Sequence, residues 1–291
     1  MTTKLLPEYL FVKVSCLLLI FLFNMGSLFS GEYERGDNDL PSSASSFESE
    51  REGKNNITKF DGELFKYNIG FWLFKKRGTA TLKCKKEHNH MIVTIDATTT
   101  GLIGKMLHRH NTYRTTMVLD NDTNSLKPLN TYEKKVKGEK ERIKITNYDY
   151  VNDVRKCKIW KNGIVRRENE IKLENRVKDD GISAFYNLRN EMYGEVKEGA
   201  SFDICTAYRD RSTDSKVYVR LPAKSDKLSK WDQGALNIRF AADITMDPEI
   251  FDSEEGKLVI LFTGDLKPVG FIAKNVIGFG DLYGVLDEEV N

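Results

Sequence analysis

Apolar and polar residues alternate one for one along much of this chain. The alternation is clearest at 65–71, 80–84, 91–97 and 236–244, where every second residue is apolar. A period of two is typical of a β-strand that turns one face to a core and the other to water. A helix needs a period near 3.6 residues, so these segments do not suit helices. The pattern predicts a chain that folds mainly as antiparallel β-sheet.

The links between these segments favour hairpins. Residues 87–90 form a short polar turn and residues 120–124 a polar loop, while Asn162-Gly163 lies between two strand-like runs. An Asn-Gly pair in that position is a strong local signal for a tight hairpin. We therefore expect neighbouring strands to pair in sequence order.

One segment breaks the period of two. Asp179 and Asp180 precede a run with apolar residues at Ile182, Phe185, Leu188 and Met192, and Gly194 closes it. An aspartate cap, helical spacing and a terminal glycine predict one short amphipathic helix. It joins strands at about 60–175 to strands at about 200–290. The predicted fold is a single β-rich domain over 58–291, an antiparallel curved sheet or partial barrel with this helix after its N-terminal strands.

The first 57 residues differ from the rest in composition and in the order of their residue types. Lys4 and Lys13 precede an apolar run at 14–23, and small residues follow up to Ser30, which is the order found in a secretory signal peptide. We predict a signal peptide over 1–30 and an exported protein, in the periplasm or associated with the outer membrane. An uncleaved N-terminal membrane anchor is the alternative. Residues 31–57 are polar and serine-rich, which predicts a disordered tether.

Charge and cysteine content exclude some classes of function. Lys and Arg number 45 and Asp and Glu 43, for a net charge of +2, and the basic residues are scattered along the chain, so no nucleic-acid partner is expected. Beyond the signal, Cys84, Cys157 and Cys205 remain, an odd number with no Cys-x-x-Cys. Cys84 alternates in phase with apolar residues and is predicted to be buried. Whether Cys157 and Cys205 pair stays open.

No catalytic or cofactor motif stands out. The four histidines form two pairs, His88/His90 and His108/His110, which lie at opposite ends of a strand of about nine residues, roughly 30 Å apart. A joint metal site is therefore not expected. Phosphate-binding loops, nucleophile elbows and zinc-protease motifs are absent from the sequence. We predict no enzyme activity, no catalytic residue, no metal and no cofactor.

The helix segment resembles a known family. Asp180-Gly-Ile-Ser183-Ala-Phe-Tyr186-Asn-Leu-Arg189 is similar to the Asp-x-x-Ser-x-x-Tyr-x-x-Arg signature of domain of unknown function 3108, a family of exported Gram-negative envelope proteins. The stretches 60–67, 256–269 and 277–286 are similar to the family's opening strand, a late strand with an aspartate turn, and its ending. The resemblance implies export and an antiparallel β fold, and it implies no activity.

The four motif residues have a structural interpretation. Asp180 suits a helix cap, and Ser183 lies near the unpaired amides of the first turn. Tyr186 and Arg189 are three residues apart and share a helix face, from which Arg189 could bind a carboxylate on the sheet, with Glu63 as a candidate. Structural locking is favoured over ligand contact.

Three hypotheses of function remain. The leading one is a non-enzymatic envelope protein that binds an apolar or amphipathic ligand, such as a lipid, inside the curved sheet. The second is a structural or interaction module of the envelope with a filled core and a protein partner. A hydrolase with dispersed residues is the third. The oligomeric state stays open.

Overall fold

A computed structural model describes residues 57–71, 74–101, 108–120, 125–173, 179–208, 211–223, 226, 236–250, 253–276 and 280–289. The predicted signal peptide and all but the last residue of the predicted tether lie outside these ranges. The elements within them are a 3-10 turn η1 (Ile57–Phe60), strands β1 (Leu64–Phe71), β2 (Phe74–Glu87), β3 (His90–Thr99), β4 (Arg109–Asp120), β5 (Ser125–Lys137), β6 (Lys140–Asp149), β7 (Val154–Lys161) and β8 (Ile164–Lys172), the helix α3 (Gly181–Arg189), strands β9 (Ser201–Tyr208), β10 (Arg211–Arg220) and β11 (Phe240–Thr245), a 3-10 turn η4 (Pro248–Ile250), and strands β12 (Lys257–Phe262), β13 (Pro268–Val276) and β14 (Gly280–Glu289).

All described strands belong to one antiparallel sheet. Its fourteen strands run in the order β8-β7-β6-β5-β4-β3-β2-β1-β14-β13-β12-β11-β10-β9. The sheet is thus two meanders joined where the first strand pairs with the last, with Ile69 opposite Gly284. Strands β8 and β9 are its edges, so within the described residues the sheet is not closed into a barrel. The prediction of a mainly β, antiparallel curved sheet is confirmed.

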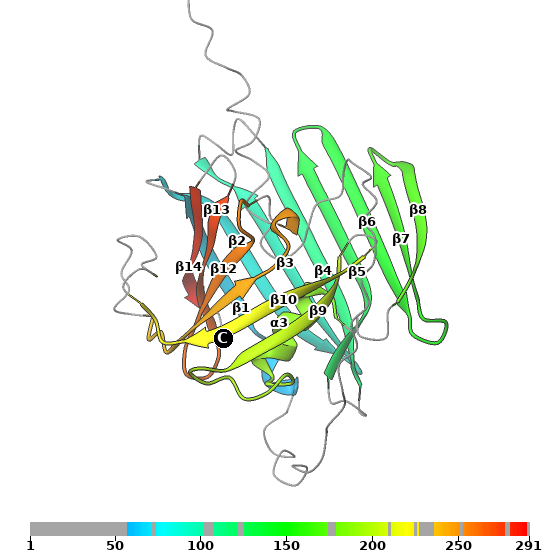
Figure 1. The fold of residues 1–291 in the computed structure, drawn as a ribbon. Coiled ribbons are helices and arrows are strands. Elements are labelled where there is room, and N and C mark those ends of the chain that lie inside the picture. Colours follow the sequence, from blue (N-terminus) through cyan, green and yellow to red (C-terminus); the bar gives the residue numbers. More distant parts are fainter. Residues whose placement is uncertain are drawn as a thin grey trace, which may run out of the picture.

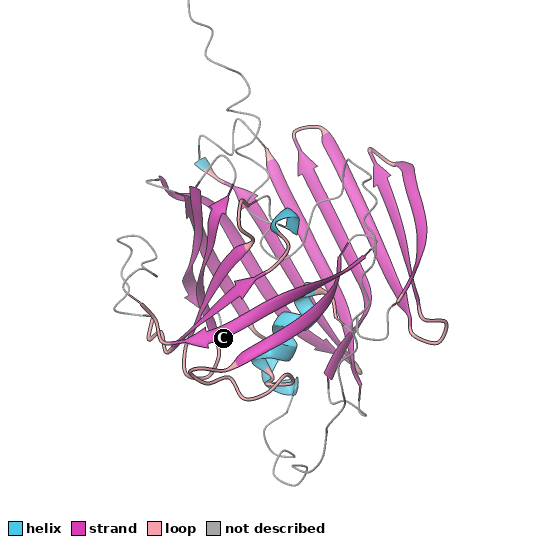
Figure 2. Cartoon of the chain, viewed as in Figure 1, coloured by secondary structure: helices cyan, strands magenta, loops and turns pink. Residues whose placement is uncertain are grey.

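The sheet curls around its helix (Figures 1 and 2). Helix α3 contacts β4 and β5 on one side and β9 on the other. The main apolar core lies between helix and sheet, where Phe65, Met117, Leu126, Tyr186 and Phe262 are almost fully buried. The curvature makes the inner face concave, and α3 occupies part of that hollow.

Asn162-Gly163 forms the predicted tight hairpin. It connects β7 to β8, and both residues have positive φ, 50° and 77°. Two positive φ values in succession are the requirement of a type I′ turn, which Asn and Gly meet at the lowest steric cost.

Two local predictions are wrong in detail. The helix ends at Arg189 rather than near Gly194, because Glu191 takes a positive φ of 59° and Met192 lies in the following turns. The strand expected over 236–244 begins only at Phe240, since Asn237 also has a positive φ, 42°. Leu236 and Ile238 instead pack on a second apolar cluster that includes Leu261 and Tyr283.

Candidate functional site

The N-terminus of α3 is fixed by a capping box. The Ser183 N–H donates to Asp180 Oδ1 at 2.7 Å, and the Asp180 N–H donates to Ser183 Oγ at 2.8 Å. The Thr115 hydroxyl of β4 donates to the second oxygen of Asp180 at 2.9 Å. Burial raises the pKa of Asp180 above its ordinary value. The cap predicted for Asp180 is therefore present, and it also ties the helix to the sheet.

The middle of α3 is tied to β5 through Asn187. Its side-chain oxygen accepts from the Leu126 N–H at 2.8 Å, and its amide nitrogen donates to the Leu126 carbonyl at 3.0 Å. The same nitrogen donates to Asp179 at 2.7 Å, and the Tyr193 hydroxyl donates to the other Asp179 oxygen at 2.8 Å. Burial raises the pKa of Asp179 to about 6, although these hydrogen bonds by themselves lower it. The side chain of Asn187 thus satisfies the backbone N–H and carbonyl of one residue of β5, as a neighbouring strand would.

The C-terminal end of α3 is tied to Glu63, the candidate partner named from the sequence. Arg189 donates to both Glu63 oxygens at 2.8 and 2.6 Å and, through Nε, to the Leu266 carbonyl at 2.8 Å. The Tyr186 hydroxyl donates to Glu63 at 3.3 Å. Asp180 thus bonds to β4, and Tyr186 and Arg189 bond to Glu63 beside β1. Of the four motif residues, only Asp180 lines one of the pockets described below. That their role is structural rather than ligand contact stays a prediction.

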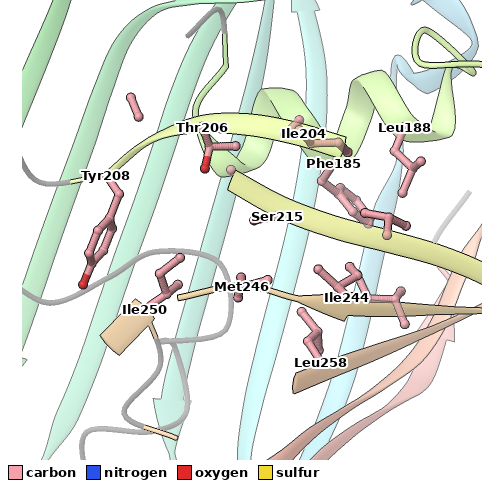
Figure 3. A pocket seen from close by; sticks show the side chains of 15 residues that line it. Phe185, Leu188, Ile204, Thr206, Tyr208, Ser215, Ile244, Met246, Ile250 and Leu258 are labelled. Atoms are coloured by element: carbon pink, nitrogen blue, oxygen red, sulfur yellow. The ribbon is translucent and has the colours of Figure 1, made fainter. Parts of the chain in front are cut away.

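An apolar pocket lies between α3 and the C-terminal strands (Figure 3). Its volume is about 100 Å³. The helix, four strands and the η4 turn supply its walls, with a few small polar groups such as Ser215 on β10. The apolar walls are made mainly by Ala184, Phe185, Leu188, Ile204, Val217, Ile244, Met246, Ile250, Leu258 and Ile260. The hydrogen bonds at both ends of α3 hold the helix wall of this pocket in place.

A polar pocket lies at the N-terminal end of the same helix. It has a volume of about 40 Å³ and is lined by Asp180, by polar side chains of β4 to β7, and by Ala207 and Tyr208. Directly opposed residues of neighbouring strands point to the same face of a sheet. Two such rows contribute to the polar wall: Tyr113, Glu133 and Lys144, then Thr115, Thr131 and Thr146. The concave face therefore changes from apolar over β9–β12 to polar over β4–β7.

The charges of the polar pocket are coupled. Burial alone raises the pKa of Glu133, but Lys135, Lys144 and Arg142 outweigh it and hold this pKa below its ordinary value. For Lys144, burial outweighs the attraction of Glu133, so its pKa lies below the ordinary value. Arg155, almost fully buried, stands opposite Tyr148, whose pKa burial raises. The polar wall thus places two carboxyl groups, Glu133 and Asp180, beside two basic side chains, Lys144 and Arg155.

The two pockets meet on β9. Ala207 and Tyr208 line both of them. A molecule that followed the concave face past these residues would move from an apolar to a polar surface around the N-terminal end of α3.

The other sequence candidates are not part of this site. His90 stands opposite Val118 and His110 opposite Thr98, so the two histidine pairs lie at opposite ends of the β3–β4 ladder. Within the described part of the chain, no three His, Cys, Asp or Glu side chains are grouped as metal ligands would be. Cys84 and Cys157 are free thiols, so Cys157 and Cys205 do not form a disulfide with each other, and burial raises the pKa of Cys84 to about 12.

The sequence did not indicate the roles of Asn187 and Asp179 or the inward cations of β4–β7. Asn187 lies inside the quoted motif but at one of its variable positions, so its docking role had no signal. The inward parity of β5 and β6 carries Glu133 and Lys144 where an apolar core residue is expected. In four successive strands, charged residues stand at alternating positions that would face the core. This pattern could have predicted a polar inner wall.

The chain is similar to one protein family and to a solved structure. A family model described as "Protein of unknown function (DUF3108)" matches residues 66–236. The crystal structure of a β-barrel-like protein of domain of unknown function DUF1849 from Brucella abortus is similar with a TM-score of 0.44 and 10% identity, over 79% of this chain and 97% of that chain. No curated protein matches the sequence. Among the described helices, none has the length and apolar character to cross a bilayer.

Proposed function

The chain belongs to the DUF3108 family, whose function is unknown, and we propose that it binds an amphipathic small molecule on the concave face of its sheet. The observation that carries the proposal is the junction at Ala207 and Tyr208, where an apolar pocket and a charged pocket share a wall. A ligand with an apolar chain and a polar end matches that junction. The proposal assigns no catalysis to the site.

The apolar pocket suits a segment of hydrocarbon chain. Each CH₂ group that leaves water for such a site contributes about 0.8 kcal/mol. Cavities lined by aliphatic and aromatic side chains stay dry and accept apolar molecules, whereas a water molecule needs two to four polar partners. The anchored helix keeps the walls in place before binding, so little ordering of the protein opposes it.

The runner-up is a structural or interaction module of the cell envelope. Strand β12 favours it, because five of its six residues are buried and both of its faces pack against apolar clusters. A filled core of this kind needs no ligand. The two proposals differ in whether the pocket beside α3 is occupied in the native protein.

Two serines on neighbouring strands give a matched test. Ser215 of β10 is buried and lines the apolar pocket, whereas Ser201 of β9 is exposed and faces away from it. We expect Ser215→Phe to fill the pocket and abolish binding of palmitate, followed by native mass spectrometry and by thermal stabilisation. Ser201→Phe adds the same bulk outside and should bind palmitate as the unmodified chain does.

Two outcomes contradict the proposal. The first is that gently purified native protein carries no lipid-sized adduct and gains no thermal stability from fatty acids or phospholipids. The second is that both serine variants bind equally well. Either result favours the filled envelope module. Thermal unfolding of both variants establishes that each is folded.

We also propose that the protein is exported and works in the cell envelope, in the periplasm or at the outer membrane. The support is the order of basic, apolar and small residues in 1–30, followed by a polar stretch. An amphipathic ligand is consistent with that compartment, because membranes supply such molecules.

A further inference from the structure

Cationic side chains gather at the far end of the concave face, away from the helix. A pocket of about 250 Å³ lies there between β4, β5, β6 and β7. Its lining contains six cations, Arg109, Lys135, Lys137, Lys140, Arg142 and Lys161, and a single carboxylate, Glu141. The whole chain has a net charge of only +2, so this pocket (the basic pocket) is a strong local concentration of positive charge.

The strand register places these cations against one another. Arg109 stands opposite Lys137, Lys137 opposite Lys140, and Lys135 opposite Arg142. Arg142 in turn stands opposite Lys161. Like charges directly opposite each other destabilise a sheet. A fold that keeps four such pairs in one pocket is best stabilised when an anion enters it.

Among the described residues, two carboxylates lie at the cations of the basic pocket. Glu133 pairs with Lys135 at 2.8 Å and lies 3.6 Å from Arg142. Glu141 is bound at 2.6 Å by Lys134, which is not among the lining residues. Even when both carboxylates are counted, the six cations leave a clear positive excess.

One donor is also left for a ligand. The Nε of Arg142 is buried and has no hydrogen-bond partner among the described residues. A buried donor without an acceptor is costly, and a guanidinium binds a phosphate through two parallel N–H groups. We propose that the basic pocket binds a phosphate-type oxyanion and, resting on the proposed function, that this oxyanion is the headgroup of the amphipathic ligand.

The helix cap and the basic pocket lie close together along β4. Thr115, which holds the helix cap, and Asn111, which lines the basic pocket, are four residues apart on β4. At about 3.3 Å per residue, this is roughly 13 Å along the strand. The polar pocket with Glu133 and Lys144 lies between them. A ligand whose chain lies beside α3 and whose polar part passes the N-terminal end of the helix would extend toward these cations along the concave face.

The test compares two lipids with the same tail on the full chain. Oleoyl-lysophosphatidate carries a phosphate, and monooleoylglycerol does not. We expect the phosphate lipid to bind roughly tenfold tighter, and added salt to weaken this preference. Inorganic phosphate alone is the third probe. Isothermal titration calorimetry measures all three affinities.

Two triple variants with the same change of charge make the test specific. Lys137→Gln with Lys140→Gln and Lys161→Gln removes three exposed cations from the basic pocket and should abolish the preference for phosphate. Affinity for monooleoylglycerol should not change. The control variant removes three exposed cations that alternate with inward residues and so face the convex side: Lys66→Gln, Lys83→Gln and Lys216→Gln. It should keep the preference.

Each other outcome decides between the two proposals. Equal affinity of the unmodified chain for both lipids overturns the headgroup inference and leaves the proposed function standing. Equal loss in both triple variants shows general attraction to a basic protein and overturns the assignment to this pocket. Lysine-dependent binding of inorganic phosphate without binding of either lipid supports an oxyanion site but overturns the amphipathic ligand.

Discussion

The guanidinium of Arg189 lies between a carboxylate and several aromatic rings. Besides its two bonds to Glu63, it stacks within 4.6 Å of the Phe60 ring centre and 5.2 Å of the Tyr186 ring centre. Its side chain is only 2% exposed. Burial alone lowers the pKa of Arg189, but the hydrogen bonds with Glu63 and the electrostatic effects of Tyr186, Glu63 and Tyr67 together raise it above its ordinary value. A buried pair of this kind is costly to break because the remaining charge stays without a partner.

Removing either end of the helix anchorage should destabilise the protein by different amounts. Asp180→Ala removes a cap and should lower the free energy of unfolding by about 0.5–2 kcal/mol. Arg189→Ala leaves Glu63 without its cation and should cost roughly 3–5 kcal/mol. Urea unfolding measures both, and Arg189→Lys should fall between Arg189→Ala and the unmodified protein. Variants that melt normally yet lose a bound ligand would show that these residues contact the ligand instead.

Asp179 should make stability depend on pH in an unusual direction. Its ordinary pKa is 3.8, and burial raises it to about 6 in the folded protein. The folded state therefore holds this proton more tightly than the unfolded state. The stabilisation that comes from this tighter proton binding is fully present below the pKa of Asp179 in the unfolded state. It is lost as pH rises through about 6. A shift of this size corresponds to about 3 kcal/mol at most.

Asp179→Asn separates this effect from other carboxyl groups. The variant should gain stability relative to the unmodified protein at about pH 7.5, and lose that gain near pH 4, where Asp179 is protonated in the folded state. Thermal unfolding at both pH values gives the difference directly. A difference that does not change with pH would contradict the raised pKa.

At the scale of elements, the side chain of Asn187 docks the middle of the helix on the backbone of a strand. Asn187 satisfies both the N–H and the carbonyl of Leu126, which lies in β5 and is 1% exposed. Asn187→Ala leaves both groups buried without partners, so we expect a loss of roughly 2–4 kcal/mol in chemical unfolding. Asn147→Ala, at an exposed position on β6, is the matched control and should change stability little. Equal stability of the two variants in chemical unfolding would mean that water satisfies the backbone groups of Leu126 when Asn187 is removed.

Strands and turns could be predicted from the sequence because their signals are local. The period of two locates β1, β2 and β3, and the Asn162-Gly163 turn is the one that two positive φ values require. The end of the helix could not be predicted from the sequence. Met192 continues the apolar spacing of the helix, but it lies in a turn that begins at Glu191, where φ is positive.

The basic pocket could not be predicted from the sequence. Its cations come from four strands, and in the sequence they are mixed with outward lysines such as Lys134 and Lys158, which makes them look scattered. Only the register brings Arg142 opposite both Lys135 and Lys161. Cross-strand register depends on every turn and bulge between the strands, including the shift at Thr116/Met117. The apolar pocket was expected only as an architectural possibility, and its walls come from segments far apart in sequence.

At the scale of the whole molecule, export predicts a shorter mature chain. If 1–30 is a cleaved signal, intact mass of protein from its native host should lack about the first thirty residues. All fourteen described strands lie after that point, so cleavage leaves the sheet complete. Full-length chain in the membrane fraction would instead support the N-terminal anchor.

The sheet as a whole depends on its last strand. Strand β14 pairs with β1 on one side and with β13 on the other, and it is the strand through which the two meanders join. Its Leu282, Tyr283 and Val285 are buried, and burial of three such side chains contributes roughly 5–9 kcal/mol. That sum is comparable to the whole stability of a typical domain, about 5–15 kcal/mol.

We therefore expect a chain ending at Val276 to lose cooperative folding. Without β14, both β1 and β13 become open edges, and open apolar edges favour aggregation. Thermal unfolding followed by circular dichroism, with size-exclusion chromatography, should show no sharp transition and no monomer. A chain that begins at Ile57 keeps all fourteen strands and should unfold as the longer chain does. If the chain ending at Val276 stays monomeric and melts cooperatively, the meanders fold independently, and the helix contacts with β4, β5 and β9 are then sufficient to hold the two halves of the concave face together.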